Sequence, residues 1–131
     1  MLRSAFLTAL VAVAIAVTAA CAQSYSDADI ATVKKMVAKG DVVVVDVRTP
    51  EEFREGHLDK AILANINDPS FDAKIASIAK DKKVLVYCAA GGRSARASKI
   101  MSEKGWKNVT NMKGGFNAWS AAGYPSVKGD K

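Results

Sequence analysis

Histidine and cysteine are scarce in this sequence, which limits the kinds of site it can build. The chain has one histidine, His57, and two cysteines, Cys21 and Cys88. These residues are widely separated and lack the spacing of metal ligands, so we expect neither a metal nor any other cofactor.

Clustered positive charge is also missing, although the chain as a whole is basic. The formal net charge is +6, yet the lysines are scattered and no basic run is interleaved with aromatic residues. We therefore expect no nucleic-acid partner. A positive surface would instead raise the local concentration of small anions.

The first 22 residues predict an export signal. Arg3 supplies a positive start, residues 6–20 are almost unbroken alanine, valine, leucine and isoleucine, and Ala20-Cys21-Ala22 has the small-x-small pattern of a cleavage site. The apolar run falls short of the roughly 20 residues that a spanning helix needs. We expect a signal peptide at 1–22, cleavage after Ala22, and export of the domain at 23–131 to the periplasm.

A lipoprotein signal is the alternative interpretation of the same residues. Cys21 follows Ala19-Ala20 and could carry lipid, which would place the protein on a membrane, but Thr18 stands where such signals usually have leucine. With either signal, Cys88 has no disulfide partner within the domain. An unpaired cysteine in an oxidising compartment is a liability unless it is buried or used.

Beyond residue 22, strand-like and helix-like segments alternate along the chain. Valine-rich or apolar runs predict strands, and amphipathic segments with capping residues predict helices. Short connections between them favour an α/β fold, in which a parallel sheet is covered by helices on both faces. The expected strands are 42–47, 61–66, 84–87 and 109–112; the expected helices are 27–39, 49–56, one from Ser70, one from Ser94 to Gly105, and one after Gly115.

The turn after Cys88 has the composition of an anion site. Cys88 ends a buried strand, Gly91 and Gly92 permit unusual backbone angles, and Ser94 is a candidate N-cap for the next helix. A turn of this kind points successive N–H groups inward, and the helix dipole adds positive potential. A thiol held there should have a lowered pKa and act as a nucleophile.

Three segments of the chain follow the motif order of a known family. They read VVVVDVRTPEEFREGHL at 42–58, VLVYCAAGGRSARAS at 84–98, and NMKGGFNAWSAAGYP at 111–125. Together they resemble the rhodanese, or thiosulfate sulfurtransferase, domain. The resemblance covers nearly all of the chain after residue 22.

The resemblance implies a sulfurtransferase in which Cys88 carries the transferred sulfur. Cys88 would take sulfur from a donor such as thiosulfate, hold it as a persulfide, and pass it to cyanide or a thiol, including a protein thiol. The loop that would bind the substrate consists of Ala89, Ala90, Gly91, Gly92, Arg93 and Ser94. We expect Arg93 either to bind the anionic end of the donor or to brace the loop through a carboxylate.

Other residues that suggest chemistry have a simpler interpretation. We expect structural roles for His57 and for Asp46 and Arg48 at the end of the valine strand. Trp106 and Trp119 are expected to be core aromatics.

Two further functions are alternatives. A cysteine phosphatase or arsenate reductase also places Cys and Arg around an anion loop, but its signature has five intervening residues, whereas four lie between Cys88 and Arg93. The other alternative is a non-catalytic carrier that receives persulfide or binds a partner protein.

Overall fold

The computed structural model describes residues 12–14 and 24–131 of the chain. The predicted cleavage site and the candidate lipid-bearing Cys21 lie outside the described residues. Within the described ranges, no helix is both long enough and apolar enough to cross a membrane.

A parallel five-stranded sheet forms the centre of the fold, with strand order β1-β5-β4-β2-β3. The two central strands, β4 and β2, are the valine-rich segments that the sequence predicts to be buried on both faces. The strands are β1 (Ser26–Ala28), β2 (Val42–Asp46), β3 (Ile62–Leu63), β4 (Lys83–Tyr87) and β5 (Asn108–Met112).

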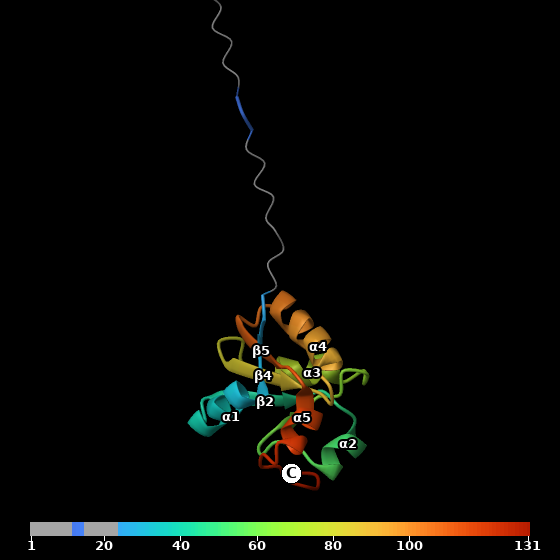
Figure 1. Cartoon of the computed structure of the whole chain (residues 1–131). Coiled ribbons are helices and arrows are strands. Elements are labelled where there is room, and N and C mark those ends of the chain that lie inside the picture. The colour runs from blue at the N-terminus through green and yellow to red at the C-terminus, as the bar shows by residue number, and fades with distance from the viewer. Residues whose placement is uncertain (1–11, 15–23) are drawn as a thin grey trace, which may run out of the picture.

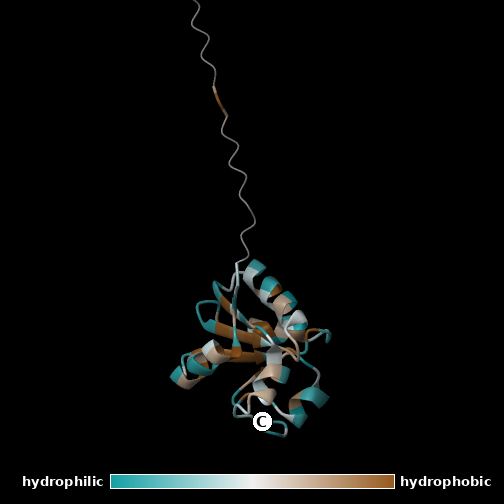
Figure 2. Ribbon diagram, in the orientation of Figure 1, coloured by the Kyte–Doolittle hydropathy of each residue, from teal (hydrophilic) through white to brown (hydrophobic). Residues whose placement is uncertain are grey.

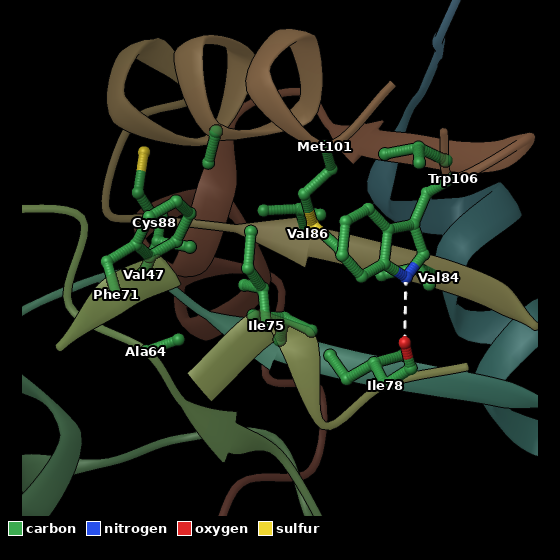
Figure 3. Packing of buried hydrophobic residues seen from close by; sticks show 13 residues of the cluster. Val47, Ala64, Phe71, Ile75, Ile78, Val84, Val86, Cys88, Met101 and Trp106 are labelled. Carbon is green, nitrogen blue, oxygen red and sulfur yellow. Dashed lines mark hydrogen bonds between the residues drawn. The ribbon is translucent and has the colours of Figure 1, made fainter. Parts of the chain in front are cut away.

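Helices cover both faces of this sheet (Figure 1). One face packs against α3 and α4 through a cluster that includes Val86, Ile75, Met101 and Trp106, drawn in Figure 3. The other face packs against α1 and α5 through Leu85 and its neighbours. The helices are α1 (Ile30–Lys39), α2 (Pro50–Glu55), α3 (Phe71–Ala76), α4 (Gly92–Glu103) and α5 (Gly115–Ala121).

The hydropathy of the elements agrees with this arrangement. In Figure 2 the central strands are the most hydrophobic part of the fold, whereas the helices carry hydrophilic residues. Successive residues of β4 point to opposite faces of the sheet, so Val84 and Val86 join one core cluster while Leu85 and Tyr87 join the other. The α/β class with two covered faces is confirmed.

Two predicted elements differ from the structure at their ends. The helix expected at 27–39 begins only at Ile30, because residues 26–28 form β1 and pair with Thr110–Met112 of β5. Asp29 then caps α1 by accepting a hydrogen bond from the Thr32 amide at 2.9 Å. The strand expected at 61–66 is only two residues long, since only Ile62 and Leu63 pair with the end of β2.

Candidate functional site

Cys88 lies at the carboxyl end of β4, in the interior of the sheet. Parallel strands bring their carboxyl ends to one edge, which is where ligands bind in open α/β sheets. The Cys88 side chain is only 1% exposed, and Figure 3 shows it pointing toward α4. Its sulfur is therefore held inside the turn that joins β4 to α4.

Two hydrogen-bond donors within this turn reach the sulfur. The Gly91 amide lies 3.1 Å from the Cys88 Sγ, and the Ser94 hydroxyl lies 3.3 Å from it. Burial by itself raises the pKa of the Cys88 thiol, but hydrogen bonds from Ser94, Gly91 and Ala90 outweigh it and lower the pKa below its usual value. The loop therefore favours the thiolate, which is the nucleophilic form.

Ser94 does not cap α4, and that prediction was wrong. The helix begins at Gly92, with Gly91 as its N-cap in the left-handed region at φ 108°. Glycine adopts this conformation without steric cost, so the N-cap lies three residues earlier than expected. Ser94 then falls in the first turn, where its hydroxyl is directed at the sulfur.

Arg93 forms a two-pronged ion pair with Glu52 of α2. Its Nη1 and Nη2 atoms donate to the two carboxylate oxygens at 2.8 and 2.9 Å. The Arg93 guanidinium is the main cause that lowers the pKa of Glu52 to about 2. Of the two roles expected for Arg93, the bracing contact is present, while donor binding stays a prediction.

Glu52 also completes the capping box that the sequence predicts at the start of α2. The Thr49 hydroxyl accepts a hydrogen bond from the Glu52 amide at 3.2 Å, and the Thr49 amide donates to the Glu52 carboxylate at 3.3 Å. The carboxylate is thereby held in place from its own helix before Arg93 reaches it. The cysteine loop is thus attached to α2.

The start of α5 supports the cysteine loop from another side. The Phe116 amide donates to the Cys88 carbonyl at 2.8 Å, and the Asn117 amide donates to the Ala89 carbonyl at 3.0 Å. Gly115, at φ 60°, allows this approach, because a Cβ atom there would lie 2.6 Å from the Cys88 carbonyl oxygen. The sequence predicts a helix start at Gly114-Gly115 but not this contact, for which the paired glycines are the local signal.

A buried ionic network lies below the loop, between β2 and β4. Arg48 donates to both carboxylate oxygens of Asp46, at 3.0 and 2.7 Å, and Tyr87 donates to the same carboxylate at 2.6 Å. Burial is the main cause that raises the pKa of Tyr87 well above its ordinary value, which keeps the phenol protonated. Asp46 and Arg48 thus make the structural contacts expected of them.

His57 and the two tryptophans are also held in structural contacts. His57 is fully buried, shares a hydrogen bond with the Phe53 carbonyl at 2.8 Å, and stacks on the Phe53 ring. Trp106 is buried and donates its indole N–H to the Ile78 carbonyl at 3.1 Å (Figure 3). Trp119 is buried in the second core cluster.

An open cleft of about 540 Å³ borders the cysteine loop between α2 and α5. Its wall includes Ala89, the residue directly after Cys88, and Glu52, the partner of Arg93. The lining residues are Arg48, Glu52, Glu55, Ala89, Phe116, Asn117, Ser120 and Ala121. The cleft thus places both charged and apolar surface beside the loop.

A smaller hollow of about 240 Å³ touches Ala90 and Gly91 from the direction of β1 and β5. Gly91 directs its amide to the sulfur, and its open side faces the Gly114 amide and the Met112 carbonyl. This second hollow therefore contacts the loop from the side of β5 and Gly114. Substrate binding by the individual loop residues stays a prediction, which applies to Ala89, Ala90, Gly91, Gly92, Arg93 and Ser94.

Comparison with known proteins finds one family along most of the chain. The family described as "Rhodanese-like domain" matches residues 29–122. A protein of Arabidopsis thaliana named "Protein HIGH ARSENIC CONTENT 1, mitochondrial" is 36% identical, covering 76% of this chain and 68% of its own. The "Thiosulfate sulfurtransferase GlpE" of Pseudoalteromonas translucida is 31% identical over 76% of this chain and 92% of its own.

A solved structure shares the fold at similar identity. The crystal structure of a rhodanese-related protein from Thermoplasma volcanium superposes with a TM-score of 0.70. It is 32% identical, and the match covers 79% of this chain and 98% of the other.

Proposed function

This chain belongs to the rhodanese-like domain family, as its three motif segments predict, and we propose that it transfers sulfane sulfur through a persulfide on Cys88. The observation that carries the proposal is the pair of donors, Gly91 N–H and Ser94 O–H, aimed at the Cys88 sulfur. They stabilise negative charge on that atom, and the same negative charge would reside on a bound persulfide.

The first half-reaction would load the cysteine. The Cys88 thiolate attacks the outer sulfur of a donor such as thiosulfate, a new S–S bond forms, and the S–S bond of the donor breaks with release of sulfite. The electron pair of the broken bond leaves with sulfite, so no external oxidant or reductant is needed. Cys88 is left as a persulfide anion inside the loop.

The second half-reaction would unload it. An acceptor, either cyanide or a thiol, attacks the terminal sulfur, and the bond to Cys88 breaks to regenerate the thiolate. The products are thiocyanate or an organic persulfide. Loading and unloading as separate steps give ping-pong kinetics.

Intact-mass measurement tests the proposal directly. Incubation with thiosulfate should add the mass of one sulfur atom, and cyanide should remove it with release of thiocyanate. Cys88→Ser is the matched control, because it keeps the approximate side-chain volume and has no thiol. Absence of the added sulfur in the parent protein would refute the persulfide route.

The structure gives a further reason to prefer sulfur chemistry over phosphatase or arsenate reductase chemistry. The Arg93 guanidinium is engaged by the Glu52 carboxylate on both nitrogens. An oxyanion substrate, or the anionic end of a donor such as thiosulfate, therefore binds Arg93 only when this ion pair opens, whereas the Cys88 sulfur is held by Gly91 and Ser94. A persulfide carrier without turnover stays the main alternative, and thiosulfate:cyanide activity of the protein distinguishes it from the enzyme.

We further propose that the protein is exported and begins at Gln23 after cleavage. The support is the composition of residues 1–22. N-terminal sequencing of material from the extracytoplasmic fraction tests this, and a lipid-modified Cys21 would place the protein on a membrane instead.

A further inference from the structure

The cleft beside the cysteine loop carries one negative charge that has no ion-pair partner in the described part of the chain. Among its charged residues, Arg48 is paired with Asp46 and Glu52 with Arg93. Glu55 is exposed and forms no ion pair within residues 24–131. The cleft is therefore locally acidic, although the chain as a whole is basic.

The cleft adjoins the cysteine loop. Its wall includes Ala89, next to Cys88, and Glu52, and the Glu52 partner Arg93 lies close enough to Cys88 to interact with its sulfur. The Glu52 carboxylate raises the pKa of Arg93, and the Cys88 thiolate adds to this rise. A substrate that approaches the loop along this cleft passes Glu52 and Glu55, because both side chains line it.

Size and lining suit an organic molecule better than a small inorganic anion. The volume of about 540 Å³ falls in the range of small-molecule sites, which is roughly 300–1,000 Å³. Phe116 and Ala121 supply apolar surface, and Asn117 and Ser120 supply polar atoms beside it. A molecule with a short carbon chain and a charged end can contact both kinds of surface.

From these observations we infer that the cleft binds the acceptor of the second half-reaction as a small organic thiol, and that Glu55 selects a cationic thiol over an anionic one. This inference rests on the proposed function. The thiol's ammonium group faces the Glu55 carboxylate, while its thiolate attacks the terminal sulfur of the Cys88 persulfide. One S–S bond forms, the bond to Cys88 breaks, and the electron pair returns to the cysteine as thiolate.

Three thiols that share a two-methylene spacer and differ in charge test the selection. The protein is first loaded with thiosulfate and freed of excess donor. Loss of the added sulfur is then followed by quenched intact mass with cysteamine, 2-mercaptoethanol or 3-mercaptopropionate, which are respectively cationic, neutral and anionic. Each rate constant in a variant is divided by that of the parent protein with the same thiol, so the intrinsic reactivity of the thiol cancels.

Glu55→Gln should lower the rate constant for sulfur removal by cysteamine and raise that for 3-mercaptopropionate, each by about 3–10-fold at low ionic strength. The change for 2-mercaptoethanol should lie between them. Added salt should reduce both effects. Glu51→Gln is the matched control, because it removes the same charge from an exposed position of the same helix outside the cleft lining. It should change the three ratios equally.

The possible outcomes separate the inference from the proposed function. If no sulfur is added by thiosulfate, the persulfide route fails, and the inference fails with it. If sulfur is added but Glu55→Gln gives the same three ratios as Glu51→Gln, the transfer stands and selection by Glu55 is overturned. Divergent ratios for cysteamine and 3-mercaptopropionate in Glu55→Gln alone support the inference.

Discussion

Removing the Ser94 hydroxyl should raise the pKa of Cys88 without changing the conformation of the cysteine loop. Ser94 is fully buried, and its Oγ donates to the Cys88 sulfur at 3.3 Å while also lying 3.2 Å from the Gly91 carbonyl. Ser94→Ala deletes one of the two donors that reach the sulfur and leaves the Gly91 amide in place. We expect the backbone of the loop to keep its conformation, because hydrogen bonds from α5 and the ion pair of Arg93 with Glu52 still hold it.

The size of the effect follows from the energy of the lost contact. A hydrogen bond to a charged group contributes about 1.5–3 kcal/mol, and one pKa unit corresponds to about 1.4 kcal/mol. We take the lower end, since the contact is long; its loss makes formation of the thiolate about tenfold less favourable and so raises the pKa of Cys88. At a pH below the Cys88 pKa of both the parent and Ser94→Ala, the thiolate fraction then falls about tenfold. The reaction rate falls by less, because a more basic thiolate is more nucleophilic.

The pH dependence of alkylation at Cys88 measures this shift. The rate of modification by iodoacetamide, read from the mass of the peptide that contains Cys88, should show a higher midpoint in Ser94→Ala than in the parent. Ser98→Ala is the matched control, because Ser98 is also a fully buried serine of α4 but its hydroxyl has no hydrogen-bond partner among the residues that the structure describes. An unchanged midpoint in Ser94→Ala, or an equal rise in Ser98→Ala, would refute stabilisation of the thiolate by Ser94.

Four other perturbations have definite expected outcomes. Cys88→Ser should abolish sulfur transfer and keep the far-ultraviolet circular dichroism; measurable turnover would contradict the mechanism. Glu52→Gln should destabilise the protein by about 1–2 kcal/mol at neutral pH, allowing for solvent screening. Since the fold lowers the pKa of Glu52 from 4.5 to about 2, the parent's advantage should disappear as pH falls through that window, which urea unfolding at several pH values checks. Gly115→Ala should place a Cβ against the Cys88 carbonyl and reduce transfer by about tenfold or more; unaltered kinetics would show that the α5 contact is not needed. Insertion of one glycine between Gly92 and Arg93 should lower transfer by roughly 10², with little change in melting temperature; full activity would show that loop length does not select the chemistry.

Local patterns in the sequence were sufficient to predict the main elements that place Cys88. Continuous valine predicted β2, the Thr49–Glu52 spacing predicted the capping box, and paired glycines predicted an unusual turn after β4. Each of these signals depends on residues close together in the chain. The short strand β1 was missed because it exists only through its pairing with β5, which lies far away in the sequence.

The same limit applies to the site. The sequence supported two roles for Arg93 equally, since the choice depends on Glu52, 41 positions earlier in the chain. The start of α4 was placed at Ser94 because serine is a frequent N-cap, whereas the left-handed Gly91 moves the start to Gly92. The contacts of the α5 amides with the Cys88 and Ala89 carbonyls join segments that no local pattern connects.

The position of Glu52 in two separate sets of contacts has a consequence for local opening. Its carboxylate accepts from Thr49 within α2 and from Arg93 at the end of the cysteine loop. Fraying of the first turn of α2 therefore releases the loop in the same event, and restoring the turn re-forms both sets of contacts. Amide hydrogen exchange should then report one shared opening free energy for the Glu52 amide, which bonds the Thr49 hydroxyl, and for the Gly91 amide, which bonds the sulfur.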